Sequence, residues 1–130
     1  MMLDTPAPAE HVFKLLVTSP FAAGKASLVA AHGLNAGPMG VTGCESANAL
    51  AAAADVVVAV GSRLQDFTTG SWTAFAPDAR IVAINAARFD ATKRRSIPVV
   101  GDAREALREL GVRLGSWRSA DDWGERARSL

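Results

Sequence analysis

The stretch Ala54 to Gly61, which reads ADVVVAVG, decides the fold class. Residues 56–60 form a continuous apolar run, mostly β-branched and without polar alternation, which is typical of a strand buried on both faces. Such strands belong to parallel sheets. The alanine-rich run 46–54 before it has high helix propensity and little bulk, so it predicts a helix lying close against that sheet.

Further strands are predicted on both sides of this unit. Residues 80–85 (RIVAIN) and 97–100 (IPVV) are short and β-rich, and Pro98 places the second strand at a sheet edge. Residues 86–95 between them offer a brief helical or looped crossover, and residues 11–19 hold a further short strand. Strands alternating with helices predict an α/β fold, a Rossmann-like parallel sheet with flanking helices.

Two helix starts carry capping signals. Thr42 and Glu45 have the spacing of a capping box, so we expect the alanine-rich helix to begin there. Asp102, with Glu105 three residues later, caps a second helix, and Gly111 is its expected C′ glycine.

Polar side chains are most concentrated in the loop that follows residues 56–60. Ligands of open parallel sheets usually lie at the carboxyl ends of strands, which makes this loop a candidate cofactor-binding site. Its candidate residues are Gly61, Arg63, Gln65, Asp66, Thr68, Thr69 and Ser71. In the purely structural alternative Arg63 pairs with Asp66, the hydroxyl groups cap local backbone, and Phe67 and Trp72 pack.

A second candidate is the loop that holds Gly37, Gly40 and Gly43. Its amides and the helix that follows favour binding of a phosphate group. Alternatively, the glycines allow close packing of helix and sheet. Because the chain has only two histidines and one cysteine, Cys44, we assign no metal ligands and no catalytic residues.

Composition narrows the class of protein further. The chain has 130 residues, with 14 Lys and Arg against 13 Asp and Glu, so its net charge is +1. We expect a soluble globular domain and exclude nucleic acid and membrane as main partners, because both require a concentrated basic face. A single cysteine and the lack of a visible targeting peptide favour the cytoplasm.

The organisation along the chain has three parts. Residues 1–18 are a leader or a replaced first strand, residues 19–115 the central α/β domain, and residues 116–130 a C-terminal tail or linker. A short helix is predicted over Lys25 to His32.

Three motifs point to a family: AGKAS (23–27), RLQDFTTGSW (63–72) and VGDAREAL (100–107). Together with ADVVVAVG they closely resemble the central domain of thiamine diphosphate-dependent enzymes. Within that family, RLQDFTTGSW is most similar to the trihydroxycyclohexanedione hydrolases of myo-inositol catabolism. The resemblance implies a domain, incomplete at its N-terminus, of a hydrolase that cleaves a carbon–carbon bond of a cyclic diketone with water.

The resemblance also implies cofactors and partners. Full-length members use thiamine diphosphate and Mg²⁺, held by a pyrimidine-binding and a diphosphate-binding domain that this chain lacks. Neither the activating glutamate nor the GDG metal motif has a counterpart here, so we expect that the chain alone binds neither cofactor and is inactive. A domain that expects such partners should expose an apolar patch, which favours self-association.

Acetolactate synthase-like relatives suggest an alternative, a free-standing nucleotide- or flavin-binding module. In them the loop after ADxxxxxG contributes to binding flavin adenine dinucleotide, and Arg63 matches its arginine. The acidic residue usual at the end of the next strand is replaced around Asn85, which argues against flavin binding. A third hypothesis is a decayed, partly folded gene product.

Overall fold

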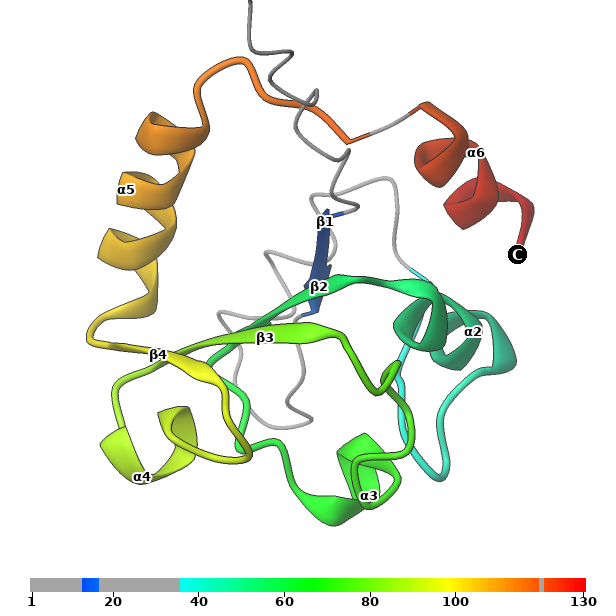
Figure 1. Cartoon of the computed structure of the whole chain (residues 1–130), viewed down its shortest axis with the longest axis horizontal. Coiled ribbons are helices and arrows are strands. Elements are labelled where there is room, and N and C mark those ends of the chain that lie inside the picture. Colours follow the sequence, from blue (N-terminus) through cyan, green and yellow to red (C-terminus); the bar gives the residue numbers. More distant parts are fainter. Residues whose placement is uncertain (1–12, 17–35, 120) are drawn as a thin grey trace, which may run out of the picture.

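The computed structural model describes residues 13–16, 36–119 and 121–130 of the chain (Figure 1). Four parallel strands form one sheet in the order β1-β2-β3-β4. They are β1 (Phe13–Leu16), β2 (Val56–Val60), β3 (Arg80–Asn85) and β4 (Ile97–Val100). The α/β fold with a Rossmann-like parallel sheet is confirmed, and β1 lies in the segment assigned to a leader or replaced strand. The predicted helix over Lys25 to His32 lies outside the described residues.

Strand β2 is buried on both faces, as its sequence predicts. Val57 and Ala59 belong to one apolar cluster with Ala47 and Ala51 of helix α2 (Glu45–Ala53). The alternate residues of β2 belong to a second cluster, against which helix α5 (Ala103–Leu114) packs. Small alanines thus let α2 approach one face of the sheet, while α5 lies on the other (Figure 1).

The expected capping box at the start of α2 is wrong. Cys44 is the N-cap residue, and no side chain caps this helix end. Thr42 and Gly43 instead belong to a tight turn, in which the amide of Gly43 donates to the carbonyl of Gly40 at 3.0 Å. Because this turn holds Thr42 two residues before the N-cap, its hydroxyl is not at the capping position.

Helix α5 begins as predicted and ends later. The Asp102 carboxylate accepts the amide of Glu105 at 3.0 Å, which confirms the N-cap. Gly111 lies inside the helix, so its assignment as the C′ glycine is wrong. The helix continues to Leu114 and ends at Gly115, whose positive φ of 54° is readily adopted by glycine.

Three further helices complete the described fold. The predicted crossover after β3 contains α4 (Arg88–Ala91), and the polar loop after β2 contains α3 (Asp66–Thr69), which the sequence did not predict. Helix α6 (Asp121–Ser129) forms in the segment assigned to a tail or linker. Its Trp123 packs against the first apolar cluster.

Candidate functional site

A network of hydrogen bonds ties together the carboxyl ends of β2 and β3, where the candidate loop begins. Gly61, with a φ of 58°, donates its amide to the carbonyl of Ile84 at 2.7 Å. The next residue, Ser62, is buried, and its hydroxyl accepts the amide of Leu64 at 3.1 Å. A main-chain bond therefore fixes the start of the loop to β3, and a side-chain bond holds Ser62 to Leu64 within the loop.

Asn85 is the buried polar residue that completes this network. Its Nδ2 donates to the carbonyl of Ser62 at 3.0 Å, and its Oδ1 accepts the amide of Ala87 at 2.9 Å. A carboxylate at this position has no proton for the Ser62 carbonyl, so the position is built for an amide. An acidic side chain here would lose the hydrogen bond to the Ser62 carbonyl. From the sequence, Asn85 was noted only because it stands where an acidic residue is usual, and its role in bridging Ser62 and Ala87 was not predicted.

Arg63 makes its contacts with Asp90 of α4 and with Lys93. Its exposed guanidinium lies 3.9 Å from the carboxylate of Asp90, and its carbonyl accepts Lys93 Nζ at 2.6 Å. Lys93 also forms an ion pair with Asp90 at 3.0 Å. The expected pair between Arg63 and Asp66 is therefore wrong. The i,i+3 spacing of Asp90 and Lys93 within the predicted crossover was the one sequence signal for this cluster.

The other candidates serve mostly to build α3. Thr69 is fully buried, and its hydroxyl donates to the carbonyl of Gln65 at 3.0 Å and accepts the amide of Trp72 at 3.1 Å. The expectation that hydroxyl groups of this loop cap local backbone is confirmed for Thr69. Trp72 packs against the core as expected, whereas Phe67 is 70% exposed, so the expectation that it packs is wrong.

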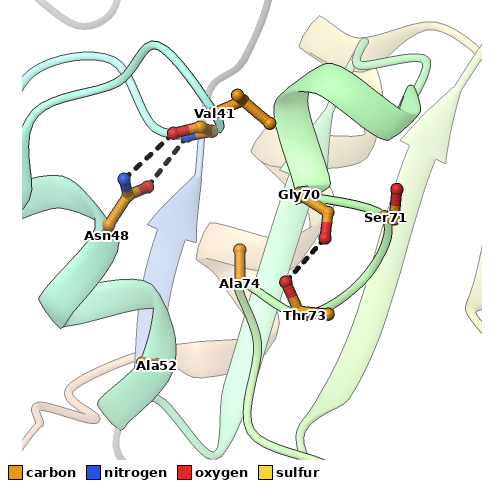
Figure 2. A pocket seen from close by; sticks show the side chains of 8 residues that line it. Val41, Asn48, Ala52, Gly70, Ser71, Thr73 and Ala74 are labelled. Atoms are coloured by element: carbon orange, nitrogen blue, oxygen red, sulfur yellow. Dashed lines mark hydrogen bonds between the residues drawn. The ribbon is translucent and has the colours of Figure 1, made fainter.

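Gly61, Arg63, Gln65, Asp66, Thr68, Thr69 and Ser71 therefore do not converge on one cavity. Of these, only Ser71 lines the depression that lies between α2 and the turn after α3 (Figure 2). Ser71 and Trp72 have φ angles of 53° and 70°, and such left-handed conformations are uncommon for residues other than glycine. The depression has a volume of about 560 Å³. Its lining residues are Gly40, Val41, Asn48, Ala52, Gly70, Ser71, Thr73 and Ala74.

The glycine-spaced loop packs closely and makes internal hydrogen bonds. A Cβ on Gly40 would lie 2.4 Å from the carbonyl oxygen of Phe67, so no side chain fits there. The amides of Val41 and Cys44 donate to the carbonyls of Phe67 and Pro38 at 2.9 and 2.8 Å. The amide of Gly40 donates to Asn48 at 2.8 Å. These amides are committed to the protein itself, which favours close packing over phosphate binding for this loop.

The part of the chain that the structure describes contains no cluster of metal-ligating side chains. Among these residues no group of three or more His, Cys, Asp or Glu side chains could hold a metal ion. The carboxylate of Asp102, in Gly101-Asp102-Ala103, is engaged in capping α5. The described helices also include none long and apolar enough to cross a membrane.

Fold and site together define a Rossmann-like α/β domain whose strand ends are tied by internal hydrogen bonds. Residues 12–110 match the family described as thiamine pyrophosphate enzyme, central domain. The chain belongs to this family.

Two curated relatives show which enzymes of this family the chain is similar to. The chain is 42% identical over 104 residues to a 3D-(3,5/4)-trihydroxycyclohexane-1,2-dione hydrolase of Geobacillus thermodenitrificans (strain NG80-2), covering 78% of this chain and 16% of the relative. It is 45% identical over 89 residues to the enzyme of that name from Clostridium botulinum (strain Alaska E43 / Type E3), covering 68% of this chain and 14% of the relative. The chain thus spans about one sixth of the length of these relatives, whose names confirm the resemblance inferred from the motifs.

Proposed function

We propose that this chain is the central-domain portion of a thiamine diphosphate-dependent hydrolase. The reaction would be hydrolytic cleavage of a carbon–carbon bond in 3D-(3,5/4)-trihydroxycyclohexane-1,2-dione, a step of myo-inositol catabolism in the cytoplasm. The observation that carries this proposal is the 42% identity over 104 residues to a hydrolase of that name. The lone Cys44 supports a reducing compartment.

The role of the chain within that enzyme is structural and interface-forming. Thiamine diphosphate and Mg²⁺ would be held by the pyrimidine-binding and diphosphate-binding domains, and the chain alone would bind neither and turn over no substrate. The engagement of Asp102 in a helix cap and of Asn85 in a loop bridge supports this division of roles. Self-association of the chain is part of the same proposal.

A chimera tests the proposal directly. The central segment of the Geobacillus relative is replaced by residues 12–110 of this chain, and diketone hydrolysis is measured with thiamine diphosphate and Mg²⁺. We expect hydrolysis by the chimera and none by the 130-residue chain alone. A matched control chimera carries the central domain of an acetolactate synthase-like enzyme and should not hydrolyse the diketone.

Two results would contradict the proposal. Turnover by the isolated chain would refute its structural role. A folded chimera that binds thiamine diphosphate but leaves the diketone intact would refute the assignment to this hydrolase.

The alternative, a free-standing nucleotide- or flavin-binding module, has less support. Asn85 leaves no acidic acceptor at the end of β3, and Arg63 lies beside Asp90 and Lys93. Calorimetric titration of the chain with adenine nucleotides and with flavin adenine dinucleotide should therefore show no heat of binding. Saturable binding of either would favour the module.

A further inference from the structure

An apolar strand that lies open to solvent forms one edge of the sheet. All four residues of β4 are exposed, Ile97 by 52% and Val100 by 50%. Among the described strands β4 pairs only with β3, so its other edge has no described strand beside it (Figure 1). A free apolar edge of this kind is a template on which a strand of another chain can pair.

The hydrogen bonds of β4 show which main-chain groups lie on the free edge. The amide of Gly101, directly after the strand, donates to the carbonyl of Asn85 in β3 at 3.1 Å. The main-chain groups of successive residues in a strand point to alternate sides. Val99 therefore faces β3 as Gly101 does, and Pro98 and Val100 face the free edge.

Pro98 removes one of the two amides that β4 would offer at this edge. Proline has no N–H group, and its ring stands where that group would point, so only Val100 can donate from the free edge of β4. A strand that approached this edge would leave one of its own carbonyls without a donor. The sequence alone placed Pro98 at a sheet edge, and the register shows in addition that the missing amide is an outward one.

Charged residues flank the strand on both sides. Lys93, Arg94 and Arg95 precede it and Asp102 follows it, each within four residues of the nearest end of β4. In natural sequences, charges and prolines placed at or beside an apolar strand hinder its assembly with other strands. The surroundings of β4 thus favour the same effect as Pro98.

We propose that Pro98 blocks the free edge of the sheet and so prevents β4 of one chain from pairing with β4 of another. The effect depends on the outward direction of residue 98. A proline at Val99 would remove a donor to β3, whereas a proline at Val100 would block the same edge. The inference goes beyond the proposed function and does not depend on which reaction the larger enzyme catalyses.

Pro98→Thr tests the proposal because it restores the outward amide with a residue that suits a strand. The full 130-residue chain and the variant are incubated at equal concentration, and β-assembly is followed by thioflavin T fluorescence and by sedimentation. Because each pairing gains one main-chain hydrogen bond, the lag time of the variant should be shorter by about tenfold. Pro98→Ala restores the same amide and should also shorten the lag time.

Two further variants separate the free edge from general effects of losing a proline. Pro77→Thr removes an exposed proline from a turn outside the sheet and should leave the lag time unchanged. Pro98→Thr combined with Val100→Pro moves the proline to the other outward position and should restore the long lag time. Thermal unfolding followed by circular dichroism verifies that each variant folds.

Three results would overturn the proposal. The first is assembly of both Pro98 variants no faster than that of the unaltered chain. The second is equal acceleration by Pro77→Thr, because loss of any proline would then be enough. The third is a folded double variant, with proline at position 100, that assembles as fast as Pro98→Thr.

Discussion

Asn85 shows how a single buried side chain can join two loops at the edge of a sheet. Both its donor and its acceptor are used, by the carbonyl of Ser62 and the amide of Ala87. The Asn85 side chain lies in a buried position, with the residue only 9% exposed. The bridge therefore depends on the amide, whatever the domain does in the larger enzyme.

Replacement of Asn85 by alanine should destabilise the domain. Loss of the side chain removes one buried and one partly buried hydrogen bond, at a cost of about 1–3 kcal/mol in total. We expect the free energy of unfolding in urea to fall by about that amount in Asn85→Ala. Thr92→Ala, which removes an exposed hydroxyl bonded to the carbonyl of Arg88, is the control and should change it by less than about 0.5 kcal/mol. Equal effects of the two variants would contradict this role.

Sequence reasoning located the candidate loop but not the arrangement of its side chains. It identified the carboxyl end of β2 correctly, because the β-branched run ends at Gly61. It could not pair Arg63 with Asp90, since that contact depends on how the crossover after β3 folds back beside the loop. The burial of Thr69 could not be predicted from the sequence either, because α3 has only four residues and no apolar period.

At the scale of elements, the strands were the more predictable. Residues 56–60 and 80–85 have strongly β-forming sequences, and the structure places β2 and β3 over the same ranges. Helix ends were less predictable because one pattern fits more than one position. Two glycines, Gly111 and Gly115, can end α5, and the helix uses the second. Helix α6 has no strong apolar period in its sequence, and its Trp123 packs against the first apolar cluster.

The two helix starts make a matched pair for testing capping. Asp102→Ala removes an observed hydrogen bond to the amide of Glu105 and should lower the free energy of unfolding by about 1 kcal/mol. Thr42→Ala removes a hydroxyl that does not cap α2 and should have almost no effect. Urea unfolding measures both variants. If Thr42→Ala lowered the free energy of unfolding as much as Asp102→Ala does, Thr42 would cap α2 and the structure would be contradicted.

At the scale of the whole molecule, burial decreases from β2 toward β4 among the residues whose burial is described. Four of the five residues of β2 are buried, whereas all four residues of β4 are exposed and α5 contains no buried residue. β2 has a hydrogen-bonded strand on each side, and β4 pairs only with β3 among the described strands. The described part of the chain therefore has a rigid centre and a weakly covered edge.

Hydrogen exchange should follow this gradient. We expect the slowest amides in β2 and β3, because their exchange requires opening of the centre of the sheet. Amides of α5 and α6 should exchange faster, since neither helix has a buried residue. Mass spectrometry of peptic fragments measures both groups in one experiment. Protection of α5 equal to that of β2 would show that α5 is covered more fully than its exposure indicates.

The strand order has a consequence for how the chain is made. Because β1, β2, β3 and β4 are neighbours in the order of the sequence, each new strand adds to the edge left by the one before it. No described strand has to be inserted between two that are already paired. During synthesis, which proceeds from the N-terminus, the sheet can thus grow in step with the emerging polypeptide. Of these four strands, the exposed strand β4 would be synthesised last. Its apolar residues would therefore spend little time without the rest of the sheet.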